Sequence, residues 1–180
     1  IYQLPFHGNR LIEGWQLSGI FTAQSGSPFS ISDGFDQAGL DNNVASTRPN
    51  VTPGCNPYVR KKVLGPTGII EPQWINSSCF TLEPAGTLGN AGRNTLVGPR
   101  HINLDFALLK NTKITERLQA QFRAEFFNIA NRTDFGGPNA SLFSSAGPTD
   151  TGAPTPTYGY IGGTAPNSQR EIQFAIKLLF

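Results

Sequence analysis

The segment LQAQFRAEFFNI, Leu118–Ile129, decides the fold class. Its apolar side chains occupy even positions from Leu118 to Phe126, and its amide and charged side chains occupy the odd positions from Gln119 to Glu125. This period of two is typical of a β-strand with one apolar and one polar face, because a helix would spread the charges around its circumference. Globular strands usually have about five or six residues, whereas a tilted strand that crosses a bilayer needs about nine to eleven.

Three other segments show the same alternation: Gly14–Gln24, His101–Leu109 and Arg170–Phe180. The apolar faces of all four segments contain only apolar residues or glycine. Their charged side chains lie on the opposite faces, at Asp105, Arg123, Glu125, Glu171 and Lys177. A Lys or Arg facing the middle of a bilayer costs about 2–4 kcal/mol, so this segregation favours lipid on one face and a barrel lumen on the other.

The connections between these segments alternate between short and long. The short ones are Phe6–Glu13 and Lys110–Arg117, and the long ones, rich in Gly, Pro, Ser and Asn, are Asp33–Arg100 and Asn131–Gln169. Outer-membrane barrels have short periplasmic turns and long external loops, so we expect both long segments on the external side.

Two aromatic residues fall near the end of the strands that this orientation makes periplasmic. They are Trp15 and Phe180, and we expect them in the aromatic belt at that membrane interface.

The register of the central hairpin follows from its parity. The apolar residues are even-numbered in both strands, so opposed residue numbers must sum to an even value. A connection centred near Ile114 predicts that Phe106 opposes Phe122, that Leu104 opposes Ala124 and that Asp105 opposes Arg123.

The fold predicted is all-β: an open, curved antiparallel meander of four long strands with a short strand at Ile1–Pro5, since four strands cannot close a barrel.

The composition excludes several classes of protein. The chain has 180 residues, 14% of them charged, and a net charge of +2, which indicates neither a nucleic-acid nor an acidic-lipid partner. No apolar run reaches the roughly 18 residues of a membrane helix. The chain begins in mid-pattern without a signal peptide, so we interpret it as the tail of a longer protein.

The sequence contains little that indicates catalysis. The two histidines are His7, in a turn, and His101, at a strand start, and there is no G-x-S-x-G, H-E-x-x-H or phosphate-loop pattern. We therefore predict no enzymatic activity and no cofactor. Arg123 and Glu125 could line a transport path, but partners within the barrel wall are the favoured interpretation.

One group of oxygen-bearing side chains could bind a hard cation: Asp33, Asp36, Asp41, Asn42 and Asn43. Their spacing does not match a known calcium loop, so a solvated loop is favoured and no metal site is predicted.

The two cysteines, Cys55 and Cys79, lie in the same long segment. Two reduced thiols and a disulfide in an oxidising compartment both fit their spacing, and we predict the disulfide.

Several stretches together resemble one protein family. They are GWQLSGIFTAQSGSPF at Gly14–Phe29, GNAGRNTLVGP at Gly89–Pro99, NLDFALLKNTKITERLQAQFRAEFFNIANRTDFGGPN at Asn103–Asn139, and the closing REIQFAIKLLF. They resemble the carboxy-terminal barrel region of TonB-dependent outer-membrane receptors, in the branch with an amino-terminal carboxypeptidase-regulatory-like domain. The resemblance covers most of the chain except Asn50–Ile70 and Ser141–Pro166.

The resemblance implies the last part of a 22-stranded barrel in the cell outer membrane. The implied partners are outer-membrane lipid, an upstream barrel and plug, and the TonB complex acting through that plug. The function it implies is energised uptake of a bulky nutrient such as a metal chelate, glycan or peptide. Two alternatives stay open from the residues: a soluble or surface β-sandwich that binds a ligand, and an outer-membrane adhesin or structural barrel without transport.

Overall fold

The computed structural model describes residues 1–40, 47–66, 68–143, 154–166 and 168–180. They form two compact units. The sheet unit consists of Ile1–Gln24, His101–Asp134 and Pro166–Phe180, and the loop unit consists of Ser25–Arg100 and Phe135–Ala165. Most of both long connections therefore belongs to one unit, and the long strands belong to the other.

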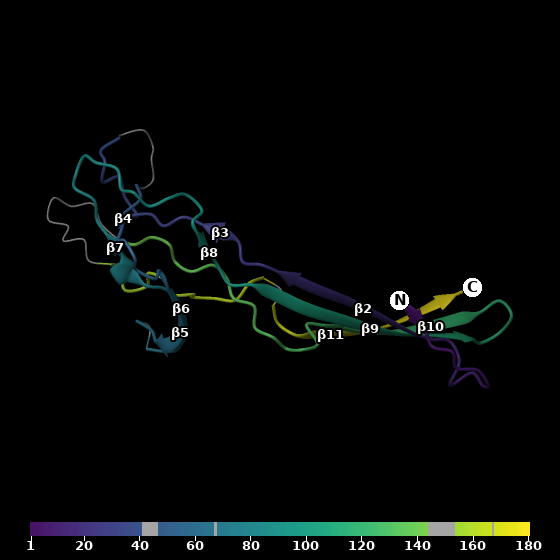
Figure 1. Ribbon diagram of the computed structural model, residues 1–180. Coiled ribbons are helices and arrows are strands. Elements are labelled where there is room, and N and C mark those ends of the chain that lie inside the picture. The colour runs from purple at the N-terminus through teal and green to yellow at the C-terminus, as the bar shows by residue number, and fades with distance from the viewer. Residues whose placement is uncertain (41–46, 67, 144–153, 167) are drawn as a thin grey trace. The chain divides into compact units, whose positions relative to one another are not determined.

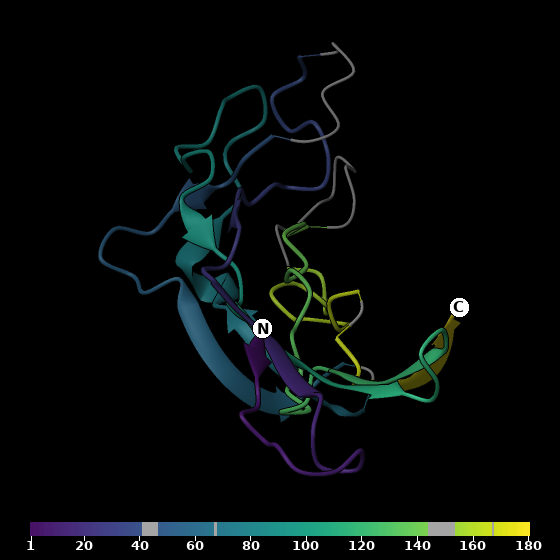
Figure 2. The same cartoon turned by 90° about the vertical axis from the view of Figure 1, so that its right-hand side faces the viewer.

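The sheet unit is one antiparallel sheet in chain order (Figure 1). Its strands are β1 (Tyr2–Gln3), β2 (Trp15–Gln24), β9 (His101–Lys113), β10 (Gln119–Phe127) and β11 (Glu171–Leu179). The predicted meander of four long strands beside a short amino-terminal one is confirmed. The sheet curves from β2 towards β11, where the carboxy terminus lies, and it does not close (Figure 2).

The register keeps each face continuous across the sheet. Leu17 of β2 opposes Leu108 of β9, and Leu108 opposes Ala124 of β10. Ala124 in turn opposes Phe174 of β11. The odd-numbered apolar residues of β2 thus meet even-numbered ones in the other three strands, and one apolar face extends over all four.

The predicted register of the central hairpin is wrong by four residues. Phe106 opposes Phe126 rather than Phe122, and Leu109 rather than Asp105 opposes Arg123. The parity argument holds, since every opposed pair still shares a face. The error came from the turn: pairing continues to Lys113 opposite Gln119, beyond the point where apolar residues stop. Backbone pairing does not require an apolar face, so periodicity could not locate the strand end.

The loop unit contains short paired strands among the described residues. Its pairs are β3 (Pro28–Phe29) with β8 (Leu96–Val97), β4 (Asn50–Val51) with β7 (Phe80–Thr81), and β5 (Tyr58–Leu64) with β6 (Ile70–Ile75). A short 3-10 helix, η1 (Ser77–Cys79), follows β6, with the Asn76 side chain accepting from the Ser78 N–H at its start. The β5–β6 hairpin is the longest of these three pairs.

The hydrophobic core of the loop unit draws on both long connections. The segment Ser25–Arg100, which includes the first connection, provides Ile31, Phe35, Ile75, Cys79, Phe80 and Leu96, and the second connection provides Leu142, Phe143 and Tyr158. Backbone bonds join the same segments: the Leu142 N–H donates to the Ser32 carbonyl at 2.8 Å, and the Trp74 N–H donates to the Gly159 carbonyl at 2.7 Å. The two connections are therefore one packed structure rather than two independent loops.

Candidate functional site

The apolar face of the sheet exposes large side chains. Phe174 and Ile176 are 69% and 74% exposed, and on the neighbouring strand Phe122 stacks on Phe174 with ring centroids 6.2 Å apart. A contiguous apolar surface of this kind marks contact with a membrane or another protein. Its composition matches the prediction that this face meets lipid.

A lysine for which the sequence pattern predicted no role lies at the end of this face. Lys110 falls on the apolar side of β9, one residue beyond the predicted strand end, yet it is only 8% exposed. Its ammonium donates to the carbonyls of Arg10 (2.8 Å) and Glu13 and lies 5.5 Å from the Trp15 ring centroid. The Trp15 indole N–H donates to the Leu11 carbonyl at 3.0 Å. Both side chains pair an apolar body with a satisfied polar tip, which is the chemistry of a membrane interface.

The register puts Phe180 at the same end of the sheet. Leu179 opposes Gln119, the first residue of β10, so Phe180 follows at the end that carries the turn after Lys113. It is fully exposed. Trp15 and Phe180 thus share one end of the sheet, as an interfacial belt requires, while their contact with lipid stays a prediction.

The polar face does not place Asp105 opposite Arg123, as the predicted register did, and no ion pair between them is described. The Asp105 carboxylate instead accepts from the Asn103 amide at 2.8 Å and from the Asn128 backbone N–H at 2.9 Å. Arg123 pairs with Glu125 on its own strand, with N and O 3.5 Å apart.

The other two predicted lumen residues lie on the same polar face. Glu171 accepts from the Gln173 amide at 2.8 Å, and Lys177 opposes Gln121. All five charged positions thus share one face, but the structure joins only Arg123 with Glu125.

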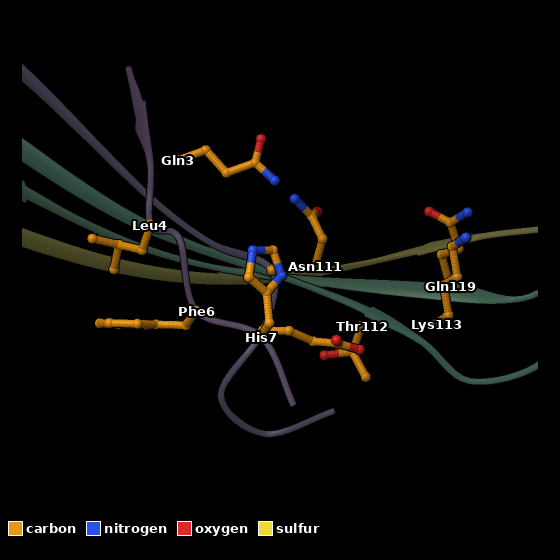
Figure 3. A pocket seen from close by; sticks show the side chains of 10 residues that line it. Gln3, Leu4, Phe6, His7, Asn111, Thr112, Lys113 and Gln119 are labelled. Carbon is orange, nitrogen blue, oxygen red and sulfur yellow. The ribbon is translucent and has the colours of Figure 1, made fainter. Parts of the chain in front are cut away.

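A pocket of about 360 Å³ opens at the turn end of this unit (Figure 3). The amides of Gln3 and Asn111 point towards each other at its rim, with the His7 imidazole beside them (Figure 3). Glu13 and Lys113 also line it. The pocket offers hydrogen-bonding groups, but His7 is its one imidazole and no cysteine lines it. Nowhere in the described ranges do three or more His, Cys, Asp or Glu side chains gather as a metal cluster.

A buried asparagine joins three segments at the opposite end of the sheet. Asn128 adopts a positive φ of 47° and is 3% exposed. Its amide donates to the carbonyls of Arg132 and Ser168, both at 2.7 Å, and its side-chain oxygen accepts from the Arg132 N–H at 3.0 Å. Because these bonds are enclosed, their loss would leave polar groups unsatisfied.

Asp134 completes this polar junction. Its buried carboxylate lies 2.7 Å from His101 and 3.7 Å from Arg132 and also accepts from the Ile102 N–H. The alternation of apolar and polar residues could not predict that Asn128 and Asp134 are buried hydrogen-bonding groups, because both residues lie beyond the end of β10.

We expect Asn128→Ala to lower the free energy of unfolding by about 2–3 kcal/mol, because three hydrogen bonds of this buried side chain are lost. Asn131→Ala is the matched control. Asn131 has nearly the same φ, 48°, and no side-chain hydrogen bond is described for it, so backbone strain changes equally in both variants. Chemical denaturation of the refolded chain in detergent measures both. Equal losses in the two variants would assign the effect to the backbone and contradict the role of the amide.

The loop unit is closed by a disulfide between Cys55 and Cys79, whose Cα atoms are 5.5 Å apart. Cys79 is fully buried in the core, so the bridge ties an outer turn to the packed centre. No free cysteine remains. The covalent link and the core together hold the described part of this unit in one packed structure.

Two carboxylates are buried in the same unit. Asp33 and Glu83 are 0% and 2% exposed, and their carboxylate oxygens form no hydrogen bond of normal geometry. Burial raises the pKa of Asp33 from 3.8 to about 7, the hydroxyl of Thr47 opposes this, and the charge of Glu83 adds to it. The expected solvated loop is therefore wrong for Asp33. Three members of that group, Asp41, Asn42 and Asn43, lie outside the described residues.

This burial predicts a pH dependence of stability in buffer without divalent cations. Folded Asp33 holds its proton up to about pH 7, whereas the unfolded chain releases it near pH 4, so the folded state binds more protons in that window. The free energy of unfolding should fall as pH rises from about 4 to 7, by up to about 4 kcal/mol, and stay level above. Denaturation at pH 5 and pH 8 tests this, with Asp33→Asn as the variant that should lose the trend. A wild type that gains stability over this window relative to the variant would contradict it.

The fold and both sheet faces agree with the comparison to known families. An outer membrane beta barrel domain matches residues 1–173, and the chain belongs to that family. It is thus part of an outer-membrane β-barrel protein. No curated protein and no solved structure matches the chain. Among the described residues, no helix is long and apolar enough to span a membrane.

Proposed function

We propose that the chain is part of a TonB-dependent receptor that takes up a bulky nutrient across the outer membrane. The observation that carries this proposal is the loop unit. Two long connections combine into one packed, disulfide-closed structure with a shared core. Binding of a large ligand is favoured by a preorganised surface, because less conformational entropy is lost.

The polar face supports the same proposal. Asp105, Arg123, Glu125, Glu171 and Lys177 would face the lumen, while the apolar face would contact lipid and Trp15 and Phe180 the interface. Energy would come from the inner membrane through TonB, acting on a plug upstream of this region. We further infer that the chain has no enzymatic activity and no cofactor, since its sequence carries no recognised nucleophile–base or phosphate-loop motif.

An outer-membrane adhesin or structural barrel is the second candidate, because a rigid loop unit also suits attachment to a surface. Family membership and location in the outer membrane argue against the soluble sandwich.

Uptake and attachment can be separated in cells. A strain lacking the parent gene is grown on defined iron and carbon sources, and any defect is complemented with the wild-type gene. Uptake of the identified nutrient is then measured with and without a protonophore, while binding to the cell surface is measured in parallel. Transport predicts that accumulation stops with the protonophore while surface binding persists. Absence of a growth defect on every source, with loss of attachment, would favour the adhesin.

A further inference from the structure

Asp33 and Glu83 come together from segments fifty residues apart. The Asp33 N–H donates to the Thr47 carbonyl at 2.8 Å, and the Gln37 amide donates to the Glu83 carbonyl at 3.1 Å. The Gln37 N–H also donates to the Thr47 hydroxyl at 3.1 Å. These bonds bring three stretches of the first long connection together, and the Glu83 charge acts directly on Asp33.

The pair lacks a neutralising partner among the described residues. No ion pair described in this part of the chain involves Asp33 or Glu83. All four carboxylate oxygens of the pair are enclosed, and none forms a hydrogen bond of normal geometry. Burying an unpaired carboxylate is strongly unfavourable, and a second like charge beside it adds to the cost. A single shared proton would leave one buried negative charge, whereas a divalent cation would neutralise both carboxylates.

We propose that Asp33 and Glu83 bind a divalent cation of the calcium class inside the loop unit. Hard cations prefer carboxylate, hydroxyl and carbonyl oxygens, and the Thr47 hydroxyl lies beside Asp33. Since no third acidic, His or Cys ligand joins them in the described part of the chain, carbonyl oxygens and water would complete the coordination.

A cation at this site would cross-link the loop unit at a second place, in addition to the disulfide. Asp33 is also linked to the second long connection, because its carbonyl accepts from the Phe143 N–H at 3.1 Å. A cation at Asp33 and Glu83 would thus stabilise the place where the two connections meet. Because a ligand pair of this kind does not exist in the unfolded chain, cation binding would be coupled to folding of the unit.

The test uses the refolded full chain in detergent at pH 7.5, after treatment with a chelator. Calcium is added alone, and binding is measured by calorimetry. Thermal unfolding is followed in Trp15→Phe, whose remaining tryptophan, Trp74, lies in the loop unit. We expect one calcium per chain, a higher unfolding temperature for this signal with calcium, and reversal by chelator.

Glu83→Gln keeps the shape of the side chain and removes one charge, so it should bind calcium at least about tenfold more weakly. Asp33→Asn should do the same. The control is Glu116→Gln, an exposed carboxylate in the turn of the sheet unit, which should bind as the wild type does. Measurement on the wild type alone keeps the test valid if either core variant fails to fold.

Two outcomes would overturn the proposal. The first is absence of calcium binding and of any thermal shift in the wild type, together with a Glu83→Gln variant that is more stable at pH 7.5. That result would assign the pair to a shared proton. The second is equal loss of binding in Glu116→Gln, which would show non-specific association of calcium with surface charge.

Discussion

Leu108→Arg should lower the free energy of unfolding in phospholipid vesicles by about 2–4 kcal/mol. Leu108 lies near the centre of β9 on the apolar face, between Leu17 and Ala124. An arginine there would face the hydrocarbon region, where no water or acidic partner can satisfy it. The measurement is a denaturant titration of the complete parent barrel folded into vesicles, together with the fraction of protein that inserts, because the open edges of this sheet need neighbouring strands in a bilayer.

Ala107→Arg is the matched control for this substitution. Ala107 is the preceding residue, points to the polar face and opposes Glu125. The same charge should therefore be tolerated there, with a change within about 0.5 kcal/mol, as for ordinary surface substitutions. If Ala107→Arg were the more damaging of the two, the faces would be assigned the wrong way round.

Replacement of both cysteines, Cys55→Ala with Cys79→Ala, should destabilise the loop unit by about 3–4 kcal/mol. The main cause is the larger conformational entropy of the unfolded chain once this 24-residue separation is no longer closed by the disulfide. Reduction of the wild type should have a similar effect. Two single-tryptophan variants separate the units: Trp15→Phe leaves Trp74 in the loop unit, and Trp74→Phe leaves Trp15 in the sheet unit.

After the cysteines are replaced, the unfolding transition reported by Trp74 fluorescence should have its midpoint at a lower denaturant concentration. The midpoint reported by Trp15 fluorescence should not change. Alkylation without reductant, followed by mass spectrometry, confirms that the wild type starts with no free thiol. Equal shifts of both signals would contradict independent stabilisation of the loop unit by its disulfide.

The strands could be predicted from sequence because membrane-type strands repeat one simple rule. Every second residue must be apolar over about ten positions, and Leu118–Ile129 shows this without any knowledge of its neighbours. The faces, the strand order and the class of protein followed from it. The register did not, since any even sum satisfies the same rule, and the actual end of β9 at Lys113 lies among polar residues.

The loop unit could not be predicted because its order comes from contacts distant in sequence. Leu142 and Phe143 pack with Ile31 and Ile75, and no local period marks these residues as core. The same applies to Glu83, whose partner Asp33 is fifty positions earlier. Lys110 was missed for a different reason, because the pairing of β9 continues past the last apolar position.

The shared core of the two long connections has an evolutionary consequence. Its members, from Ile31 to Leu96 and from Leu142 to Tyr158, all lie outside the strands of the large sheet. Mutations can therefore remodel this module while the alternation that suits the bilayer is left unchanged. Paralogues could diversify by exchanging it as a cassette, provided that both connections are inherited together, since either one alone would bring only part of the core.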